Sequence, residues 1–217
     1  FAFAFIIPFI EGVYLSFCKF TTVGNAHWVG LENYKAALTS QDFTYSFWVT
    51  AAFTVISVIT VNVFAFCIAL LLTRKLRGTN FFRTVFFLPN LIGGIVLGYT
   101  WQQMINAVLF KYGTTIVSQF KYGFVGLIIL MNWQLIGYMM IIYIAGLQNI
   151  PTELIEAAEI DGATHMQTLF KVKIPMVMPS ITICIFLTLS NSFKLFDQNL
   201  SLTAGAPLHK TEMLALN

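Results

Sequence analysis

The strongest constraint on this chain is a set of four long windows that contain no Asp, Glu, Lys or Arg. They cover 43–73, 84–110, 122–152 and 174–193 and hold 109 of the 217 residues. A helix needs roughly 20 apolar residues to cross a bilayer, so each window can supply one span. With 58% hydrophobic residues, 10% charged residues and a mean hydropathy of +0.78, the chain is predicted to be an all-α integral membrane protein.

The windows and their flanks predict a single transmembrane domain over 1–217, a polytopic helical bundle with about five spans. Pro89 and the pair Gly93–Gly94 predict a break in the third span. Phe1 opens inside an apolar run and Asn217 comes just after a polar stretch, so we expect sequence to be missing at both ends, with a sixth span after Asn217. The expected spans are about 1–18, 45–73, 84–107, 123–146 and 175–196.

Several classes of protein are excluded by the same pattern. Unbroken apolar runs lack the alternation of a β-barrel, and a net charge of +3 is too small and scattered to indicate a nucleic-acid partner. His27, His165 and His209 lie in three different loops, and no catalytic, metal-binding or nucleotide-binding motif is present. No cofactor and no metal are expected, which leaves transport or channel function as the default.

Lys and Arg also bear on orientation, because they favour the cytoplasmic side. With five spans, the loops at 74–83 and 148–173 fall on one side and hold six basic residues, and the other side also holds six. The basic turn of Arg74, Lys75, Arg77 and Arg83 is the densest group and weakly favours its own side as cytoplasmic.

The long polar segment 148–173 is the most informative loop. Pro151 suits a first helical turn and predicts a short helix to about Ile160, and Gly162 can end it in the left-handed conformation. Thr164 and Gln167 form a capping-box pattern that starts a second helix running toward Lys173. The prediction is a helix, turn and helix at the membrane surface; composition alone also fits an ordinary solvated loop.

The residues of this loop resemble a known signature. Glu156-Ala157-Ala158, three residues, Gly162, nine residues and then Val172-Lys173-Ile174-Pro175 are similar to the EAA motif of ABC importer permeases, E-A-A-x3-G-x9-I-x-L-P. Val172 and Ile174 depart from that pattern but keep its apolar character. The flanking AGLQNIP, the IDGAT within the motif and the late sequence FKLFD resemble the maltose-type sugar permeases, and this resemblance extends over nearly the whole chain.

This resemblance implies a type I importer in which two permease subunits form the pathway. Two cytoplasmic ATPase subunits power it, and an extracellular or periplasmic solute-binding protein delivers the substrate. The second permease is expected to be a different chain, and the membrane to be the cytoplasmic membrane of a bacterium or archaeon. The EAA loop, placed in the cytoplasm, would dock on the ATPase. The docking residues implied are Glu156, Ala157, Ala158, Asp161 and Gly162.

Polar residues within the spans are candidates for substrate contact, because intramembrane polarity is costly and usually faces a cavity or another helix. In the family the sugar meets the helices before and after the EAA loop. Gln134 and Tyr138 are four residues apart on one helical face. Alternatively, the amides join helices, as we expect for Asn62, and Lys194 extends to the interface or pairs with Asp197. The candidates are Gln134, Tyr138, Trp133, Asn132, Asn191, Ser192 and Lys194.

The predicted function is therefore the permease subunit of an ATP-driven carbohydrate importer, with an oligosaccharide as the expected cargo. It would have no ATPase site of its own. Two other hypotheses remain: an ABC permease for a non-sugar solute such as an amino acid, and a channel or secondary transporter that works without an ATPase.

Overall fold

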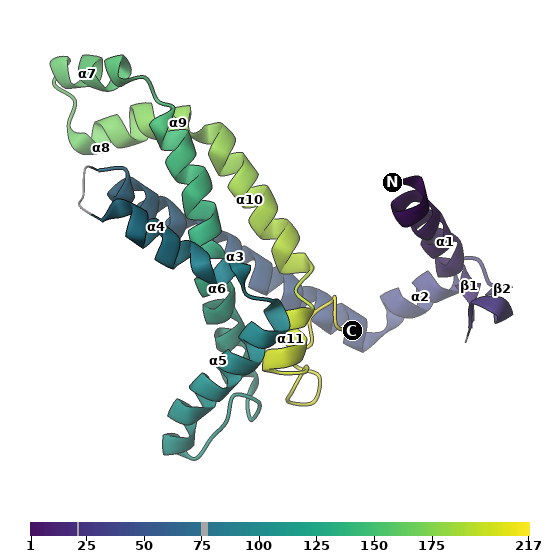
Figure 1. Cartoon of the computed structure of the whole chain (residues 1–217). Helices are drawn as coiled ribbons and strands as arrows, with labels where there is room; N and C mark the ends of the chain where they lie inside the picture. The colour runs from purple at the N-terminus through teal and green to yellow at the C-terminus, as the bar shows by residue number, and fades with distance from the viewer. Residues whose placement is uncertain (21, 75–77) are drawn as a thin grey trace. The chain divides into compact units, whose positions relative to one another are not determined.

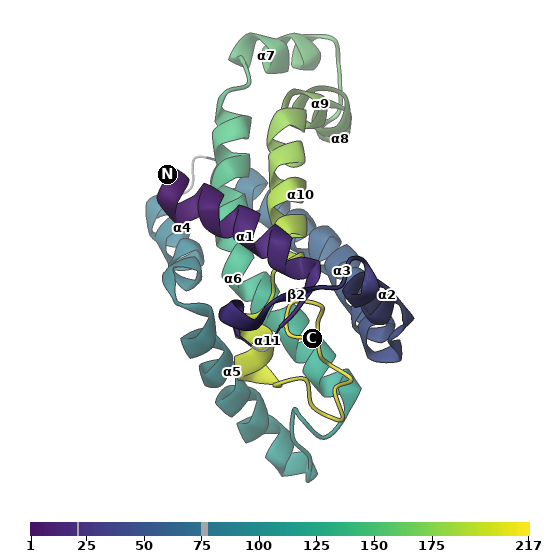
Figure 2. The same cartoon turned by 90° about the vertical axis from the view of Figure 1, so that its right-hand side faces the viewer.

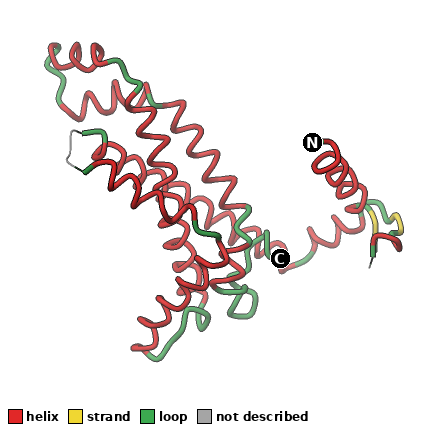
Figure 3. Tube along the Cα trace, viewed as in Figure 1, coloured by secondary structure: helices red, strands yellow, loops and turns green. Residues whose placement is uncertain are grey.

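The computed structural model describes residues 1–20, 22–74 and 78–217 and divides into two compact units, 1–47 and 48–217. Helices dominate both units, and the strands described belong to the first (Figure 3). Lys75 and Arg77, which the sequence places in the basic turn, lie outside the described residues.

The first unit joins an apolar helix to a short amphipathic one. A π-helical turn (η1, Ala2–Ile6) leads into α1 (Ile7–Ser16), then β1 (Cys18–Lys19), η2 (Val23–Asn25), β2 (His27–Trp28) and α2 (Glu32–Thr39). The strands pair antiparallel, with Cys18 opposite Trp28. The Tyr34 hydroxyl lies 2.6 Å from Ser16 Oγ, and the Phe17 ring stacks on Trp28 at 5.2 Å. The first contact holds α2 against the end of α1, and the second holds β2 there.

Two long helices form the frame of the second unit. They are α3 (Gln41–Leu72), which begins in the first unit, and α6 (Phe120–Gln148). Half of the most apolar stretch of α6 is buried, against 28% for α3. The buried stripe of α3 recurs every three or four residues, whereas large apolar side chains on its other face are exposed. That exposed face suits contact with lipid, and it includes Val55, Ile59, Val63 and Phe64.

A polar cluster joins three helices inside the bundle. The Tyr143 hydroxyl of α6 donates to Asn62 Oδ1 of α3 at 2.7 Å, and Asn62 Nδ2 lies 3.3 Å from Thr188 Oγ1 of α10 (Met178–Phe193). The Phe66 ring meets the Tyr143 ring edge to face at 5.3 Å. The expectation that Asn62 joins helices is confirmed.

The third expected span is broken into two arms. It consists of α4 (Thr79–Phe87), η3 (Leu88–Leu91), α5 (Gly94–Leu109) and η4 (Phe110–Tyr112), and its arms are bent by 102°. Pro89 offers no N–H to continue the helix, and Ile92 and Gly93 are extended, so the break follows from the sequence. The first arm packs on α6 at Gly137, where an added Cβ would lie 1.8 Å from the Phe86 carbonyl oxygen.

The polar hairpin follows α6. It contains α7 (Thr152–Ile160), α8 (His165–Thr168), a π-helical turn (η5, Leu169–Lys173) and α9 (Ile174–Met176). The segment His165–Met176 is bent by 69° from α10. The fifth helix therefore starts at Met178, later than the expected Pro175, because Pro179 has no N–H and Val177 leaves the helical conformation.

The chain leaves α10 earlier than the sequence predicts. The helix ends at Phe193, and a separate helix, α11 (Asp197–Leu202), follows. Small residues let α11 approach α5 closely, since a Cβ on Gly98 would lie 1.8 Å from Ser201 Oγ. Gly94 and Gly98, one helical turn apart on α5, thus form the face that α11 contacts.

Among the described residues, two helices are long and apolar enough to cross a membrane, or up to four if each bent pair counts as one span. The N-terminal apolar helix, Phe3–Ser16, is shorter. Within the second unit α6 and α10 run side by side, with α7 and α8 beyond one end and α5 and α11 toward the other (Figures 1 and 2).

Candidate functional site

The hairpin is built by local signals that the sequence contains. Pro151 caps α7, and Gly162 adopts φ +76° directly after Asp161. The N–H of Asp161 donates to the Ala157 carbonyl at 2.9 Å, which closes the last turn of the helix. Thr164 Oγ1 accepts from the Gln167 N–H, and the Gln167 side chain accepts from the Thr164 N–H at 2.8 Å. The predicted turn and capping box are confirmed.

The proposed docking residues lie on the outer side of this hairpin. Glu156, Ala157, Asp161 and Gly162 are exposed, and Ala158 is half-buried. Within the described part of the chain, none of the four acids of the segment forms an ion pair, so the surface keeps its negative charge. Such a surface can accept charge-assisted hydrogen bonds from Arg or Lys on a partner. The four acids are Glu153, Glu156, Glu159 and Asp161.

A polar cavity of about 280 Å³ lies where α6, α10, α11 and η3 meet. Amide groups dominate its polar lining, together with one cation and one carboxylate. Three of the predicted residues belong to it: Gln134, Asn191 and Lys194. The structure adds three further polar residues: Asn90, Asp197 and Gln198.

A hydrogen bond joins the α6 and α11 walls of this cavity. Gln198 Nε2 donates to Gln134 Oε1 at 2.9 Å, and Gln134 is buried. This bond uses one polar atom of each amide, which leaves Gln134 Nε2 and Gln198 Oε1 to meet a ligand. The cavity can therefore both donate and accept hydrogen bonds.

Lys194 and Asp197 share the cavity but form no ion pair among the residues that are described. The alternative of an ion pair at helical i,i+3 spacing is therefore wrong. The two residues are not on one helix, because Lys194 follows the last residue of α10 and Asp197 is the first residue of α11. The charge of each side chain remains directed to the cavity and not to its neighbour.

The predicted aromatic residues lie elsewhere. Trp133 is 43% exposed and meets Trp101 of α5 edge to face at 5.5 Å. The Tyr138 ring lies 6.5 Å from the Phe87 ring of α4. Neither side chain lines the polar cavity in this structure.

Asn132 and Ser192 also lie outside the cavity lining. Asn132 Nδ2 donates to the Ile128 carbonyl of its own helix at 2.8 Å, and its buried Oδ1 has no partner among the described residues. Ser192 is fully buried, and its hydroxyl donates to the Thr188 carbonyl at 2.8 Å.

Sequence reasoning missed Asn90 as a cavity residue. Its signal was a carboxamide inside an uncharged window, directly after the proline that breaks the helix. A helix break in a membrane protein is tolerated where it faces protein or a cavity, so such a residue is a candidate for a cavity wall.

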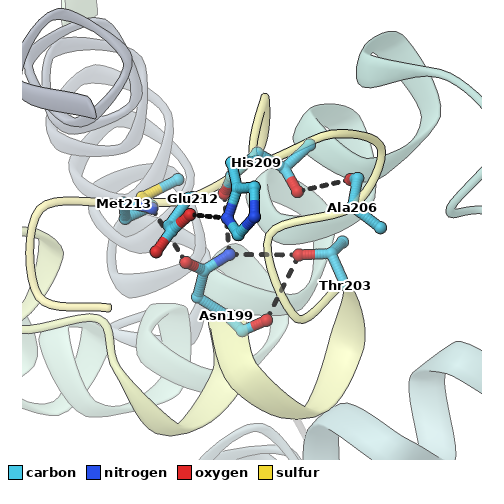
Figure 4. A network of polar contacts seen from close by, with 7 residues as sticks. Asn199, Thr203, Ala206, His209, Glu212 and Met213 are labelled. Atoms are coloured by element: carbon cyan, nitrogen blue, oxygen red, sulfur yellow. Dashed lines mark hydrogen bonds and ion pairs between the residues drawn. The ribbon is translucent and has the colours of Figure 1, made fainter. Parts of the chain in front are cut away.

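A buried network holds α11, and with it one wall of the cavity (Figure 4). Asn199 has no exposed surface, and its Nδ2 donates to Thr203 Oγ1 at 3.1 Å and to the Thr211 carbonyl at 2.9 Å. Its Oδ1 accepts from the Met213 N–H at 2.9 Å. Asn199 thus ties α11 to the 203–217 segment, on which His209 Nδ1 and Glu212 Oε2 form a hydrogen bond.

Apolar helices with lipid-suited faces and a polar cavity among them define an integral membrane protein of the all-α class. Residues 78–217 match the family described as "Binding-protein-dependent transport system inner membrane component", and the chain belongs to this family. The resemblance to ABC importer permeases that the EAA residues indicate is confirmed, and so is the predicted fold class.

Relatives match the chain over almost its whole length. It is 44% identical to the "probable starch degradation products transport system permease protein AmyD" of Thermoanaerobacterium thermosulfurigenes, over 98% of this chain and 75% of the relative. It is 31% identical to the "multiple sugar-binding transport system permease protein MsmF" of Streptococcus mutans, over 98% of this chain and 77% of the relative. The maltose-type resemblance is consistent with both names.

A solved structure shares the fold. A chain in the crystal structure of a bacterial ABC transporter involved in the import of the acidic polysaccharide alginate superposes with a TM-score of 0.82. The match covers 99% of this chain and 77% of that chain at 18% identity. At this identity the likeness establishes the fold.

Proposed function

We propose that this chain is a permease subunit of an ATP-driven, binding-protein-dependent importer whose cargo is a carbohydrate, most simply an oligosaccharide. It forms part of the translocation path and contains no ATPase site. Its partners are a second permease, two ATPase subunits and a solute-binding protein, in the cytoplasmic membrane of a bacterium or archaeon. The observation that supports this most is the exposed acidic hairpin built around the EAA residues, whose carboxylates form no ion pair within the described ranges.

The hairpin is proposed to dock on the ATPase at the cytoplasmic side. Ala157 and Ala158 add little bulk, so a partner surface can approach the α7 backbone closely. Glu156 and Asp161 offer carboxylates, and hydrogen bonds to charged groups contribute about 1.5–3 kcal/mol each. Because α7 is joined to α6 and, through α8, to α10, a displacement of the hairpin would be transmitted to two helices that line the polar cavity.

The polar cavity is proposed to contact the sugar. Gln134, Asn191 and Lys194 would bond sugar hydroxyls, with Asn90, Asp197 and Gln198 as further partners. Amides suit this task because each both donates and accepts. The substrate roles of Trp133, Tyr138, Asn132 and Ser192 stay predictions, and contact through them would require a conformation in which they reach the path.

The carbohydrate class is supported by what the relatives are named for. One is named for starch degradation products, one for multiple sugars, and a Thermococcus litoralis relative, 28% identical over 97% of this chain and 75% of the relative, for trehalose and maltose. The four amides of the cavity each donate and accept hydrogen bonds, which suits the many hydroxyl groups of a sugar.

The test is transport by the assembled complex. The chain, expressed with the partner permease, ATPase and binding protein from neighbouring genes, is purified and reconstituted in proteoliposomes that contain ATP. We expect ATP-dependent uptake of labelled maltooligosaccharides and none of labelled amino acids. Uptake of amino acids would support the non-sugar alternative, and failure of any ATPase to copurify would support a channel or secondary transporter.

A further inference from the structure

A second cavity, of about 550 Å³, lies between the end of α3 and the polar hairpin. Apolar side chains form one part of its wall, and titratable side chains form the other. The apolar part includes Leu70, Ile155 and Leu169. The titratable residues are Arg74, Glu159, His165 and Lys173.

Both cations of this cavity flank an uncharged window of the sequence. Arg74 is the first charged residue after the uncharged window 43–73, and Lys173 is the last before the window 174–193. Long Lys and Arg side chains near the ends of apolar helices extend to the membrane interface. The fold brings these two borders, 99 positions apart in sequence, into one cavity.

Neither cation has a counterion among the side chains that the structure describes. Within the described ranges neither Arg74 nor Lys173 has a carboxylate within 4.0 Å, and Glu159, though it lines the same cavity, pairs with neither. Lys173 is half-buried, so its charge is partly removed from water and gains from an anion. Arg83 adds positive charge near the same helix end, since its Nη2 lies 3.5 Å from the Leu72 carbonyl oxygen.

We propose that this cavity binds the phosphate of an anionic membrane phospholipid. Basic pockets between helices at the cytoplasmic interface are suited to lipid headgroups. Arg74 and Lys173 bind the phosphate, His165 donates a hydrogen bond, and the apolar wall accommodates the start of an acyl chain. Glu159, which is exposed, accepts from headgroup hydroxyls such as those of glycerol. A bound lipid would link the end of α3 to the hairpin.

Lipid retention tests the proposal without reference to the cargo. The assembled importer is reconstituted in nanodiscs of phosphatidylcholine with a minor fraction of phosphatidylglycerol. The complex is then released from the discs, and native mass spectrometry measures how much phosphatidylglycerol it retains. Removing one cation with Lys173→Gln should lower retention roughly fivefold, and adding Arg74→Gln should lower it again by about as much. Lys171→Gln is the matched control, because Lys171 is exposed two residues away and does not line the cavity.

Lys173→Arg preserves the charge and should retain the lipid, which separates a loss of binding from misfolding.

Inorganic phosphate, titrated in discs of phosphatidylcholine alone, distinguishes the source of the phosphate. If it protects the complex from thermal unfolding as much as phosphatidylglycerol does, the lipid assignment is overturned. Equal retention by wild type and the double variant would also overturn it, as would an equal loss in Lys171→Gln. Loss of ATPase copurification in lipid-free detergent by the double variant would assign the cavity to the ATPase contact instead.

Discussion

Gln198 Nε2 and Gln134 Oε1 are joined by a hydrogen bond of 2.9 Å that links α11 to α6. Their residues are 64 positions apart, and both line the polar cavity. The bond orients two amides toward one space, where the remaining polar atom of each can meet a hydroxyl group.

Replacing Gln134 by Leu should lower sugar uptake roughly tenfold, because it removes a ligand and leaves the Gln198 amide without its partner. ATPase assembly should survive, since the hairpin is untouched. Uptake in proteoliposomes and copurification of the ATPase measure the two effects. Gln119→Leu is the control, because it makes the same change at an exposed amide that does not line the cavity. Equal losses in both variants would contradict the assignment.

Glu156→Lys should leave membrane insertion intact and reduce ATP-driven uptake about tenfold or more, because it reverses a charge that is proposed to pair with a basic ATPase residue. Glu32→Lys makes the same charge change on α2, at an exposed position outside the hairpin, and should transport normally. ATPase copurification and uptake are measured together. Unchanged uptake in Glu156→Lys would count against the docking role.

Gly137→Ala should destabilise the second unit by about 3 kcal/mol, because the new Cβ would lie 1.8 Å from the Phe86 carbonyl oxygen and backbone must move. The matched control is Gly12→Ala in α1, where a Cβ meets nothing within 4 Å. Thermal unfolding in detergent compares the two variants. A Gly137→Ala protein that melts like wild type would show that α4 does not pack on α6 this closely.

Tyr143→Phe should cost about 1 kcal/mol, within the range measured for hydrogen bonds between membrane helices. It removes the hydroxyl that donates to Asn62 Oδ1 at 2.7 Å and keeps the ring. A double-mutant cycle with Asn62→Leu in a chemical unfolding assay isolates the pair. Strictly additive effects of the two substitutions would argue against the contact.

Asn199→Leu should destabilise the 203–217 segment by about 2–3 kcal/mol or more, because it removes a buried amide and leaves the Thr211 carbonyl and the Met213 N–H without their hydrogen-bond partner. Limited proteolysis should then cut this segment faster. Asn191→Leu is the control for stability, since Asn191 is exposed and its amide donates to the Leu187 carbonyl of its own helix. Equal proteolysis rates would refute the anchoring role of Asn199.

The hairpin was largely predictable because its determinants are local. The cap at Pro151, the left-handed Gly162 and the Thr164–Gln167 capping box act within a few residues of one another. The cavity was only partly predictable. Gln134, Asn191 and Lys194 were found by their polarity within apolar helices, whereas Asn90 required knowledge of where the broken third helix lies.

The sequence by itself determined the membrane class, the apolar helices and the EAA hairpin, because uncharged length and helix capping are short-range properties of the chain. The tertiary structure alone decided that α10 stops at Phe193 and α11 turns back toward α5, and that Trp133 and Tyr138 face other aromatic rings. The physical reason is that lipid tails are as apolar as the helices themselves. Hydrophobicity therefore determines which segments enter the membrane. Which helices pack together is determined by close contacts at glycines and by hydrogen bonds of buried amides.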